Sequence, residues 1–515
     1  MRPTFMGFET AKSAVFTNQK SLDIVGNNLA NINTPGYTRQ RVERTAISQS
    51  TFSNRVSSNR IGLAGQGVES LGVSQMRDAF LDKCFRDEYS KASYHGQAAS
   101  ILSSIQSTLT DGNDITSSAG IQGAIEQLYS GLNQFINEPT LDSGANIVMS
   151  AFKNICHVLN QLDEQLQVVT NQQIDDLRAS VTRVNEITSA IAHLNDTISK
   201  DAASLNTGSN EHFKPNELLD QRNQLLDELA SYGDIKVTEL ANGTVSVEMG
   251  GHKVVNGNSA DSLTMNVSDE KLVSINWRTS GDNIRLSAGS MLADLHFING
   301  RGSNIQSKDE STEQGIPYYR DRLDSFAHAL ASFVNSSVPE YDPLTDEPRT
   351  DADGKIIYKT LLSASSYGGA GDGRITAASI SLSTEWIQGG AGYFIYNRDE
   401  SVEDYAQKMA STLVDEKFTF QSYGESFTGT FAEYNVEMLG RLGTDLQYQE
   451  GRHEASATVA DDFLERRDQI AGVSQDEETA DMLRYQRSYE AAARLMTILD
   501  EVLDVLINRM GRVGL

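Results

Sequence analysis

The side chains that most often perform catalysis in proteins form no recognised catalytic pattern in this sequence. The eight histidines include no His-Glu-x-x-His pair, and no Gly-x-Ser-x-Gly turn is present to expose a nucleophilic serine. Two glycine-rich segments, 62–67 and 368–373, miss the dinucleotide fingerprint because Ala64 and Arg374 stand where glycine is needed. We therefore predict that the chain is not an enzyme and binds no cofactor.

Metal binding is equally weakly supported. The run Asp351-Ala352-Asp353-Gly354 resembles part of a calcium loop, but with Gly354 in the sixth position Arg349 would be the first ligand, so the EF-hand ligand set fails. The two cysteines, Cys84 and Cys156, are too few for a disulfide framework and match no metal-ligand spacing. We expect both to be unpaired, buried and apolar in character, and we predict no metal site.

Composition narrows the class of partner. The 515 residues carry a formal net charge of −27, which argues against binding nucleic acid or an anionic membrane surface, since both need clustered Lys and Arg. No run of eighteen apolar residues suggests a membrane span, and residues 1–10 lack the apolar core of a cleaved signal peptide. Composition alone would place the chain in the cytoplasm.

The elements begin with a helix over about the first thirty residues. Its apolar positions recur at alternating steps of three and four, which is a heptad seam with one polar interruption. The seam residues are Phe8, Ala11, Val15, Asn18, Leu22, Val25 and Leu29. After the helix, Thr34-Pro35-Gly36-Tyr37 predicts a type II turn, because Pro suits its second position and Gly its third.

Long helices are predicted from about Ala79 to Leu229, with breaks near Pro139 and Gly208. The period then changes to two around the turn Asn242-Gly243, which indicates a β-hairpin followed by short strands to about Leu286. Helical periodicity returns at 320–334, at 402–414 and from Phe431 onward, and the segment between 336 and 424 is rich in loops.

The last helix has the most regular heptad pattern in the chain. Ser474 and Glu477 fit a capping box, and three acidic residues, 476–478, suit the positive end of the helix dipole. A lone exposed helix of this kind is only marginally stable, so we expect it to need the N-terminal helix and neighbouring subunits as partners. Its seam residues are Met482, Tyr485, Tyr489, Ala492, Met496, Leu499, Leu503 and Leu506.

These patterns predict an α+β multidomain fold with paired terminal coiled-coil helices, a helical-bundle domain and a β-rich middle domain. Residues 1–40 with 472–515 would form the terminal helix pair. Residues 41–232 with 300–335 and 425–471 would form the bundle, and 233–299 the β-rich domain. The loop-rich region 336–424 is variable in character and could belong to the outer β-rich domain.

Both ends of the chain resemble the flagellar rod, hook and hook-associated axial protein family. At the N-terminal end the resemblance rests on Ser21-Leu22-Asp23-Ile24-Val25-Gly26-Asn27-Asn28-Leu29-Ala30-Asn31 followed by Asn33-Thr34-Pro35-Gly36-Tyr37. At the C-terminal end it rests on Gly472-Val473, 476–478 and 485–494. The continuation Thr38-Arg39-Gln40 and the segment 216–229 are similar to the hook-associated FlgK family within it.

The resemblance implies a secreted structural subunit of the extracellular bacterial flagellum that joins hook to filament. It implies export through the flagellar type III apparatus, assembly as a ring of copies at the hook tip, hook protein below, and a second junction protein or the filament above. A chaperone would cover the C-terminal region. The alternatives are another hook or distal rod protein, or a secreted effector or adhesin that shares the export route.

The resemblance also points to the residues of axial assembly. We expect the asparagine-rich end of the first helix and its turn to set that helix against its neighbours, together with the seam of the last helix given above. The N-terminal set is Asn27, Asn28, Ala30, Asn31, Thr34, Pro35, Gly36 and Tyr37. Leu495, Val502 and Ile507, beside the main seam, would remain for other subunits.

Overall fold

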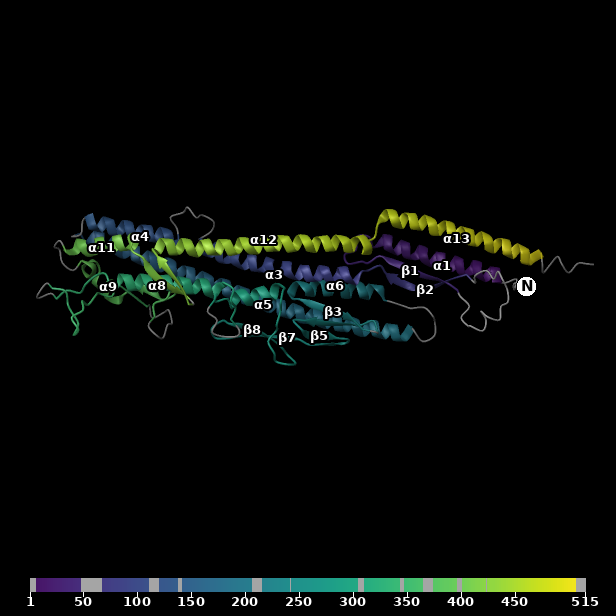
Figure 1. Cartoon of the computed structure of the whole chain (residues 1–515), viewed down its shortest axis with the longest axis horizontal. Helices are drawn as coiled ribbons and strands as arrows, with labels where there is room; N and C mark the ends of the chain where they lie inside the picture. Colours follow the sequence, from purple (N-terminus) through teal and green to yellow (C-terminus); the bar gives the residue numbers. More distant parts are fainter. Residues whose placement is uncertain are drawn as a thin grey trace, which may run out of the picture.

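The computed structural model is elongated, with a pair of helices at one end, long helices through the middle and a small sheet along one side (Figure 1). It describes residues 6–47, 67–110, 120–137, 141–205, 215–240, 242–303, 310–342, 347–364, 374–395, 401–422 and 424–505. The predicted α+β multidomain class is confirmed.

Helices provide the length of the molecule. The long axis is built by α3 (Ala79–Leu109), α5 (Asp142–Leu205) and α12 (Phe431–Ala471), and α5 alone spans about 96 Å at 1.5 Å per residue. The terminal pair is α1 (Met6–Ala30) and α13 (Gln475–Asp504). The remaining helices are α4 (Gly120–Asn137), α6 (Asn216–Tyr232), α7 (Ser290–Ile298), α8 (Ile316–Val334), α9 (Thr384–Gly389), α10 (Ala391–Phe394) and α11 (Ser401–Asp415).

The described strands form small antiparallel sheets. The largest has the order β3-β4-β5-β6, and the turn at Asn242-Gly243 joins its first two strands as predicted. The pairs β1-β2, β7-β8, β9-β10 and β11-β12 complete the set. Their bounds are β1 (Gln40–Ala46), β2 (Val68–Gln75), β3 (Ile235–Glu239), β4 (Val245–Met249), β5 (His252–Asn256), β6 (Ser259–Ala260), β7 (Leu263–Val267), β8 (Val273–Trp277), β9 (Leu362–Ala364), β10 (Ile380–Leu382), β11 (Phe418–Ser422) and β12 (Glu425–Gly429).

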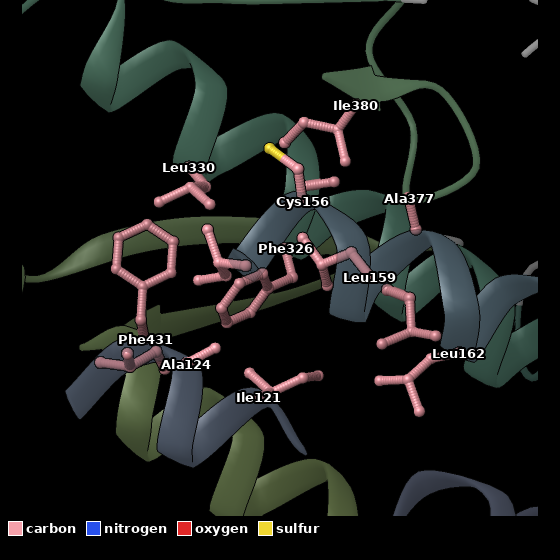
Figure 2. Packing of buried hydrophobic residues seen from close by; sticks show 14 of the residues in the cluster. Ile121, Ala124, Cys156, Leu159, Leu162, Phe326, Leu330, Ala377, Ile380 and Phe431 are labelled. Carbon is pink, nitrogen blue, oxygen red and sulfur yellow. The ribbon is translucent and has the colours of Figure 1, made fainter. Parts of the chain in front are cut away.

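Two hydrophobic cores lie along α5. The first joins its N-terminal half to α3, α4, α8, α11 and α12, and Figure 2 shows part of it around Cys156, Phe326 and Phe431. The second joins the C-terminal half of α5 to α6 and to strands β3–β8. The residues that recur at heptad spacing in this half are all buried, namely Leu177, Val181, Val184, Thr188, Ile191, Asn195 and Ile198. One continuous helix therefore ties the helical and the β-rich parts together.

The loop-rich region contributes to the first core. Leu361, Ile380, Trp386 and Phe394 pack there among the helices, and Phe394 stacks against Trp386. We propose on this basis that 336–424 belongs with the helical bundle. Alternating apolar and polar residues are few in this region, so its partner could not be chosen from the sequence.

Several local predictions need correction. The helix predicted to start at Arg320 starts at Ile316, since Pro317 is tolerated in the first turn of a helix. Helix α7 was not predicted, because its nine residues are largely apolar and too few to show a helical period. Cys156 is buried but Cys84 is only partly buried, and both are free as predicted. The predicted breaks at Pro139 and Gly208 lie outside the described residues, although α4 and α5 end nearby at Asn137 and Leu205.

Candidate functional site

The two ends of the described chain pair with each other at one end of the molecule (Figure 1). Helices α1 and α13 run antiparallel. Near the start of α1, a Cβ atom on Gly7 would lie 3.4 Å from Leu499 Cδ1, and near its end Asn28 Nδ2 donates to Glu478 Oε2 at 3.0 Å. Residues more than 400 positions apart in the sequence thus form one structural unit.

The predicted seam of α13 is less exposed than the residues around it. Ala492 is buried, and the other described seam positions, Met482, Tyr485, Tyr489, Met496, Leu499 and Leu503, are partly buried. In contrast, Leu495 and Ile498 are 45% and 56% exposed. The predicted period is therefore confirmed over the described residues, and Leu506 and Ile507 lie outside them.

Helix α1 also packs against the paired strands β1 and β2. Thr17, Ser21 and Asn28 are buried there. Arg44 of β1 donates to Ser21 Oγ and places its guanidinium 4.5 Å from the centre of the Tyr485 ring. Since guanidinium groups are attracted to aromatic faces, Arg44 ties the hairpin to both terminal helices.

The asparagines at the end of α1 form one hydrogen-bond network. Asn31 Nδ2 donates to the backbone and side-chain oxygens of Asn27, both at 3.0 Å, and Asn31 N donates to the same backbone oxygen at 3.1 Å. Asn28 Oδ1 accepts from Tyr37 Oη at 2.8 Å and from Gln40 N at 3.0 Å. Asn28 is 1% exposed, so its amide is a structural link between α1, the turn and β1.

The turn after α1 has the predicted geometry. Tyr37 N donates to Thr34 O at 3.2 Å, and Gly36 has a φ of 78°, as the third position of a type II turn requires. Thr34, Pro35 and Gly36 are exposed, as is Ala30 at the end of the helix. The structure thus divides the predicted N-terminal set into a network around the buried Asn28 and an exposed turn.

Arg39 links this turn to the start of α13. Its Nε donates to Glu478 Oε1 at 2.7 Å, and its Nη1 donates to Glu477 Oε2 at 2.6 Å. Charge-assisted hydrogen bonds of this kind are stronger than neutral ones. The predicted capping box is wrong: Ser474 is the N-cap but its side chain makes no capping bond, and the Glu477 side chain, which would form the other half of the box, is paired with Arg39.

A second set of hydrogen bonds joins the segment after this turn to α6 in the body of the molecule. Asp220 of α6 accepts from Thr38 N at 3.2 Å and from Gln75 Nε2 at 2.8 Å. Burial raises the pKa of the Asp220 carboxyl. Burial, with Asp220 and Glu478 nearby, raises the pKa of Tyr37 well above its usual range, so its hydroxyl stays protonated and can donate to Asn28. Tyr37 and Asp220 therefore hold the segment after α1 against α1 and α6.

Sequence reasoning missed Arg39, Arg44, Glu478 and Asp220 as members of the site. The available signal was charge: the first 44 residues are rich in basic side chains, and the start of the last helix is acidic. Charge complementarity predicts that the ends attract, but it does not identify pairs. In the described residues, no three His, Cys, Asp or Glu side chains group so as to hold a metal ion. Nor does any described helix have the length and apolar character needed to cross a membrane.

Comparisons with known proteins match both ends and the middle of the chain. Residues 102–338 match the family described as the flagellar hook-associated protein FlgK helical domain. Residues 8–38 match the flagella basal body rod protein family, and residues 468–510 match the flagellar basal body rod FlgEFG protein C-terminal family. The two terminal matches coincide with the paired helices α1 and α13.

Individual relatives agree with these matches. The chain is 27% identical over 532 aligned residues to flagellar hook-associated protein 1 of Bacillus subtilis, covering 99% of each. It is 25% identical to the Salmonella typhimurium protein of the same name, over 49% of this chain and 43% of that one. The solved FlgK hook junction protein of Burkholderia pseudomallei aligns with 56% of this chain and 47% of its own, at 21% identity and a TM-score of 0.40.

Proposed function

Because the chain belongs to the flagellar hook-associated FlgK family, we propose that its paired terminal helices form the surface by which it assembles at the tip of the hook. The protein is a structural component of the hook–filament junction of the bacterial flagellum. As a flagellar component it acts outside the cell, and we propose that it has no enzymatic role.

The exposed apolar row on α13 carries the proposal. Large apolar side chains stand on the outer face of this helix, beside the seam that α1 covers. Rows of this kind on otherwise charged surfaces mark interaction sites. The row consists of Leu483, Leu495, Ile498, Val502 and Val505.

The expected partners follow from this surface and the family. Copies of the chain would pack around a ring through the α13 row, with hook protein below and a second junction protein or the filament above. Before assembly, a chaperone would cover the C-terminal region, because exposed apolar rows promote premature association. We propose that the chain travels through the flagellar type III export apparatus.

The helical domain favours this role over other axial roles. The terminal matches are to rod-protein families, so the ends alone would fit a rod or hook subunit equally well. The match over residues 102–338 is to the hook-associated family and therefore favours the junction. A secreted effector or adhesin would need neither terminal signature.

Electron microscopy of a strain that lacks the protein tests the role directly. Hooks without filaments are expected, and restoring the gene should restore filaments. Normal filaments in the deletion strain would refute the junction role, while loss of the hooks themselves would indicate a rod or hook subunit.

A further inference from the structure

The exposed residues of α1 form a strip beside the seam that faces α13. They recur at alternating steps of three and four, so they lie on one face of the helix. Each follows a seam residue by one position, and one residue turns an α-helix by about 100°. Phe16, in the middle of this strip, is 59% exposed. The α1 strip consists of Glu9, Lys12, Phe16, Gln19, Asp23, Gly26 and Ala30.

Helix α13 has a second exposed strip, and this one precedes its seam. Ala491, Leu495, Ile498 and Val502 each stand one position before a seam residue and are exposed. The strip is basic near the start of the helix and apolar toward its end, where it includes most of the exposed apolar row described above. The α13 strip consists of Arg484, Arg487, Ala491, Leu495, Ile498, Val502 and Val505.

The two strips face opposite sides of the helix pair. Because α1 and α13 are antiparallel, a step forward along α1 and a step backward along α13 turn in the same sense when both are viewed from one end. The seams face each other, so this shared turn carries the two strips to opposite sides.

The strands β1 and β2 agree with this placement. Ser21 and Asn28, which bond β1, each precede a seam residue of α1, so the strands lie on the side away from the α1 strip. Arg484 of the α13 strip lines a hollow of about 250 Å³ together with Arg41 and Val42 of β1. The α13 strip therefore lies on the same side as the strands, and the α1 strip lies on the other.

We propose that in the assembled ring the α1 strip of one copy packs against the α13 strip of the next copy. The proposal rests on the proposed function, and it names the surface that covers the exposed apolar row of α13. Two different faces on opposite sides of one molecule make a head-to-tail contact, which repeats around a ring. Every copy then has both strips covered by its two neighbours.

The charges of the two strips match when neighbouring copies lie at one height. Asn28 meets Glu478, and both helices extend from this contact in the same direction, side by side (Figure 1). Counting along both helices from there brings Asp23 of one copy level with Arg484 and close to Arg487 of the next. Asp23 and Arg487 are exposed, and neither forms an ion pair within the described part of the chain. Opposite charges at one level fix the register of a contact.

Phe16 supplies the apolar anchor at the next level. The Cα–Cβ bonds of a helix tilt toward its N-terminus, so in antiparallel strips the side chains of Phe16 and Leu495 lean toward each other. The small Ala491 leaves room for the ring between its larger neighbours, as a hole receives a knob in a coiled coil. Glu9 stands three positions before Lys12, so the cation of the α1 strip has an acidic neighbour at helical spacing.

An exchange of charges tests the polar part of the contact. Asp23→Arg sets cations against each other between copies and Arg487→Asp sets carboxylates against each other, so each should lower the fraction of hooks bearing filaments about tenfold. The double variant restores the pair and should recover most filaments. The control, Asp175→Arg, reverses an exposed charge on α5 and should leave filaments normal. Losses in the double variant as large as in the single variants would overturn the contact.

A cysteine pair tests the apolar part in isolated flagella. Phe16→Cys/Leu495→Cys, in a chain whose own cysteines are replaced by alanine, should give a ladder of covalent dimers and larger multimers on mild oxidation. The purified monomer should stay unlinked, because the two positions face opposite sides of one molecule. The control is Phe16→Cys/Glu490→Cys: Glu490 follows the seam residue Tyr489 and so lies on the side of Phe16. No ladder from the first pair, or equal ladders from both pairs, would overturn the proposal.

The result is separable from that of the deletion strain. Bare hooks after deletion, together with no ladder from the first cysteine pair, would overturn the contact between the strips and leave the junction role intact. Normal filaments after deletion would overturn the junction role, and the ladder in the assembled structures that contain the chain would still decide the contact.

Discussion

Arg39 and Glu478 are 439 residues apart in the sequence and form an ion pair at 2.7 Å between the two ends of the chain's described part. Glu478 is 1% exposed, so its charge depends on Arg39 and on the amide of Asn28. A hydrogen bond to a charged group contributes about 1.5–3 kcal/mol. At the residue scale, this link fixes the start of α13 against the end of α1.

Replacing Arg39 should therefore impair assembly. Arg39→Gln leaves the buried Glu478 without its cation, and we expect the fraction of hooks bearing filaments to fall about tenfold, which corresponds to roughly 1.4 kcal/mol. The matched control is Arg178→Gln, which breaks an exposed pair with Asp175 on α5 and should have almost no effect. Filament counts by electron microscopy measure both, and similar losses in the two variants would contradict a special role for Arg39.

Asp294 of α7 predicts a pH dependence of stability. It is 2% exposed, accepts from Gln97 Nε2 at 2.7 Å, and burial raises its pKa to about 7. Because the folded-state pKa lies above the ordinary value of about 3.9, the stability that this group contributes is fully present below pH 4 and is lost as the pH rises to about 7.

Asp294→Asn should remove that dependence. We expect the variant to melt above the original chain by a margin that grows from pH 5 to pH 7 and then stays constant, since the amide imitates the neutral acid. The control, Asp175→Asn, changes an exposed carboxylate on α5. Melting curves of the purified chain across this range measure the difference, and a constant margin at all pH values would disprove the explanation.

At the scale of elements, α13 has two apolar faces with different partners. Leu499 and the seam lie toward α1, whereas Ile498 and Val502 are 56% and 49% exposed. An isolated helix of this length is marginal in water, so both faces must be covered for the helix to be stable. The outer face has no cover within the described chain, and we assign it to neighbouring copies.

Ile498→Glu tests the role of the exposed face of α13 without changing the seam toward α1. The substitution should change the free energy of unfolding of the purified chain by no more than about 0.5 kcal/mol, because the side chain is exposed. In cells it should prevent most of the protein from joining the hook, since a charge would be buried between copies. Ile498→Leu serves as the apolar control and should assemble normally. Normal assembly of Ile498→Glu would show that this face stays in water.

At the scale of the whole molecule, stability is distributed unevenly. Both hydrophobic cores lie along α5, and neither contains a described residue of α1 or α13. The terminal pair is held by the seam between α1 and α13, by the paired strands β1 and β2, and by the ion pairs of Arg39 with Glu477 and Glu478. Elements with few buried apolar contacts open at lower free energy than the core.

Hydrogen exchange on the purified monomer should show this difference. Amides in residues 1–40 and 475–515 should exchange with almost no protection, while those of the bundle within 100–230 are protected. The same terminal amides should become protected in assembled flagella. Strong protection at both ends of a verified monomer would mean that the terminal helices are stable before assembly.

The sequence by itself determined the features that arise from neighbouring residues. Heptad spacing predicted the seam of α13, Pro35 and Gly36 predicted the turn, and Asn242-Gly243 predicted the β-hairpin, because each depends on local backbone preferences and on burial of one face. The paired ends were predicted from their shared periodicity and from the family resemblance.

Only the tertiary structure decided which distant side chains meet. Glu477 fits a capping box in the sequence, yet its side chain bonds Arg39, because a cation brought close by folding outcompetes the local backbone N–H. Trp386 and Phe394 pack into the helical core, a choice that no local period encodes. Arg222 is buried, with hydrogen bonds to Asn195 of α5 and to the carbonyl of Gly243, and burial of this kind depends on contacts across the whole chain.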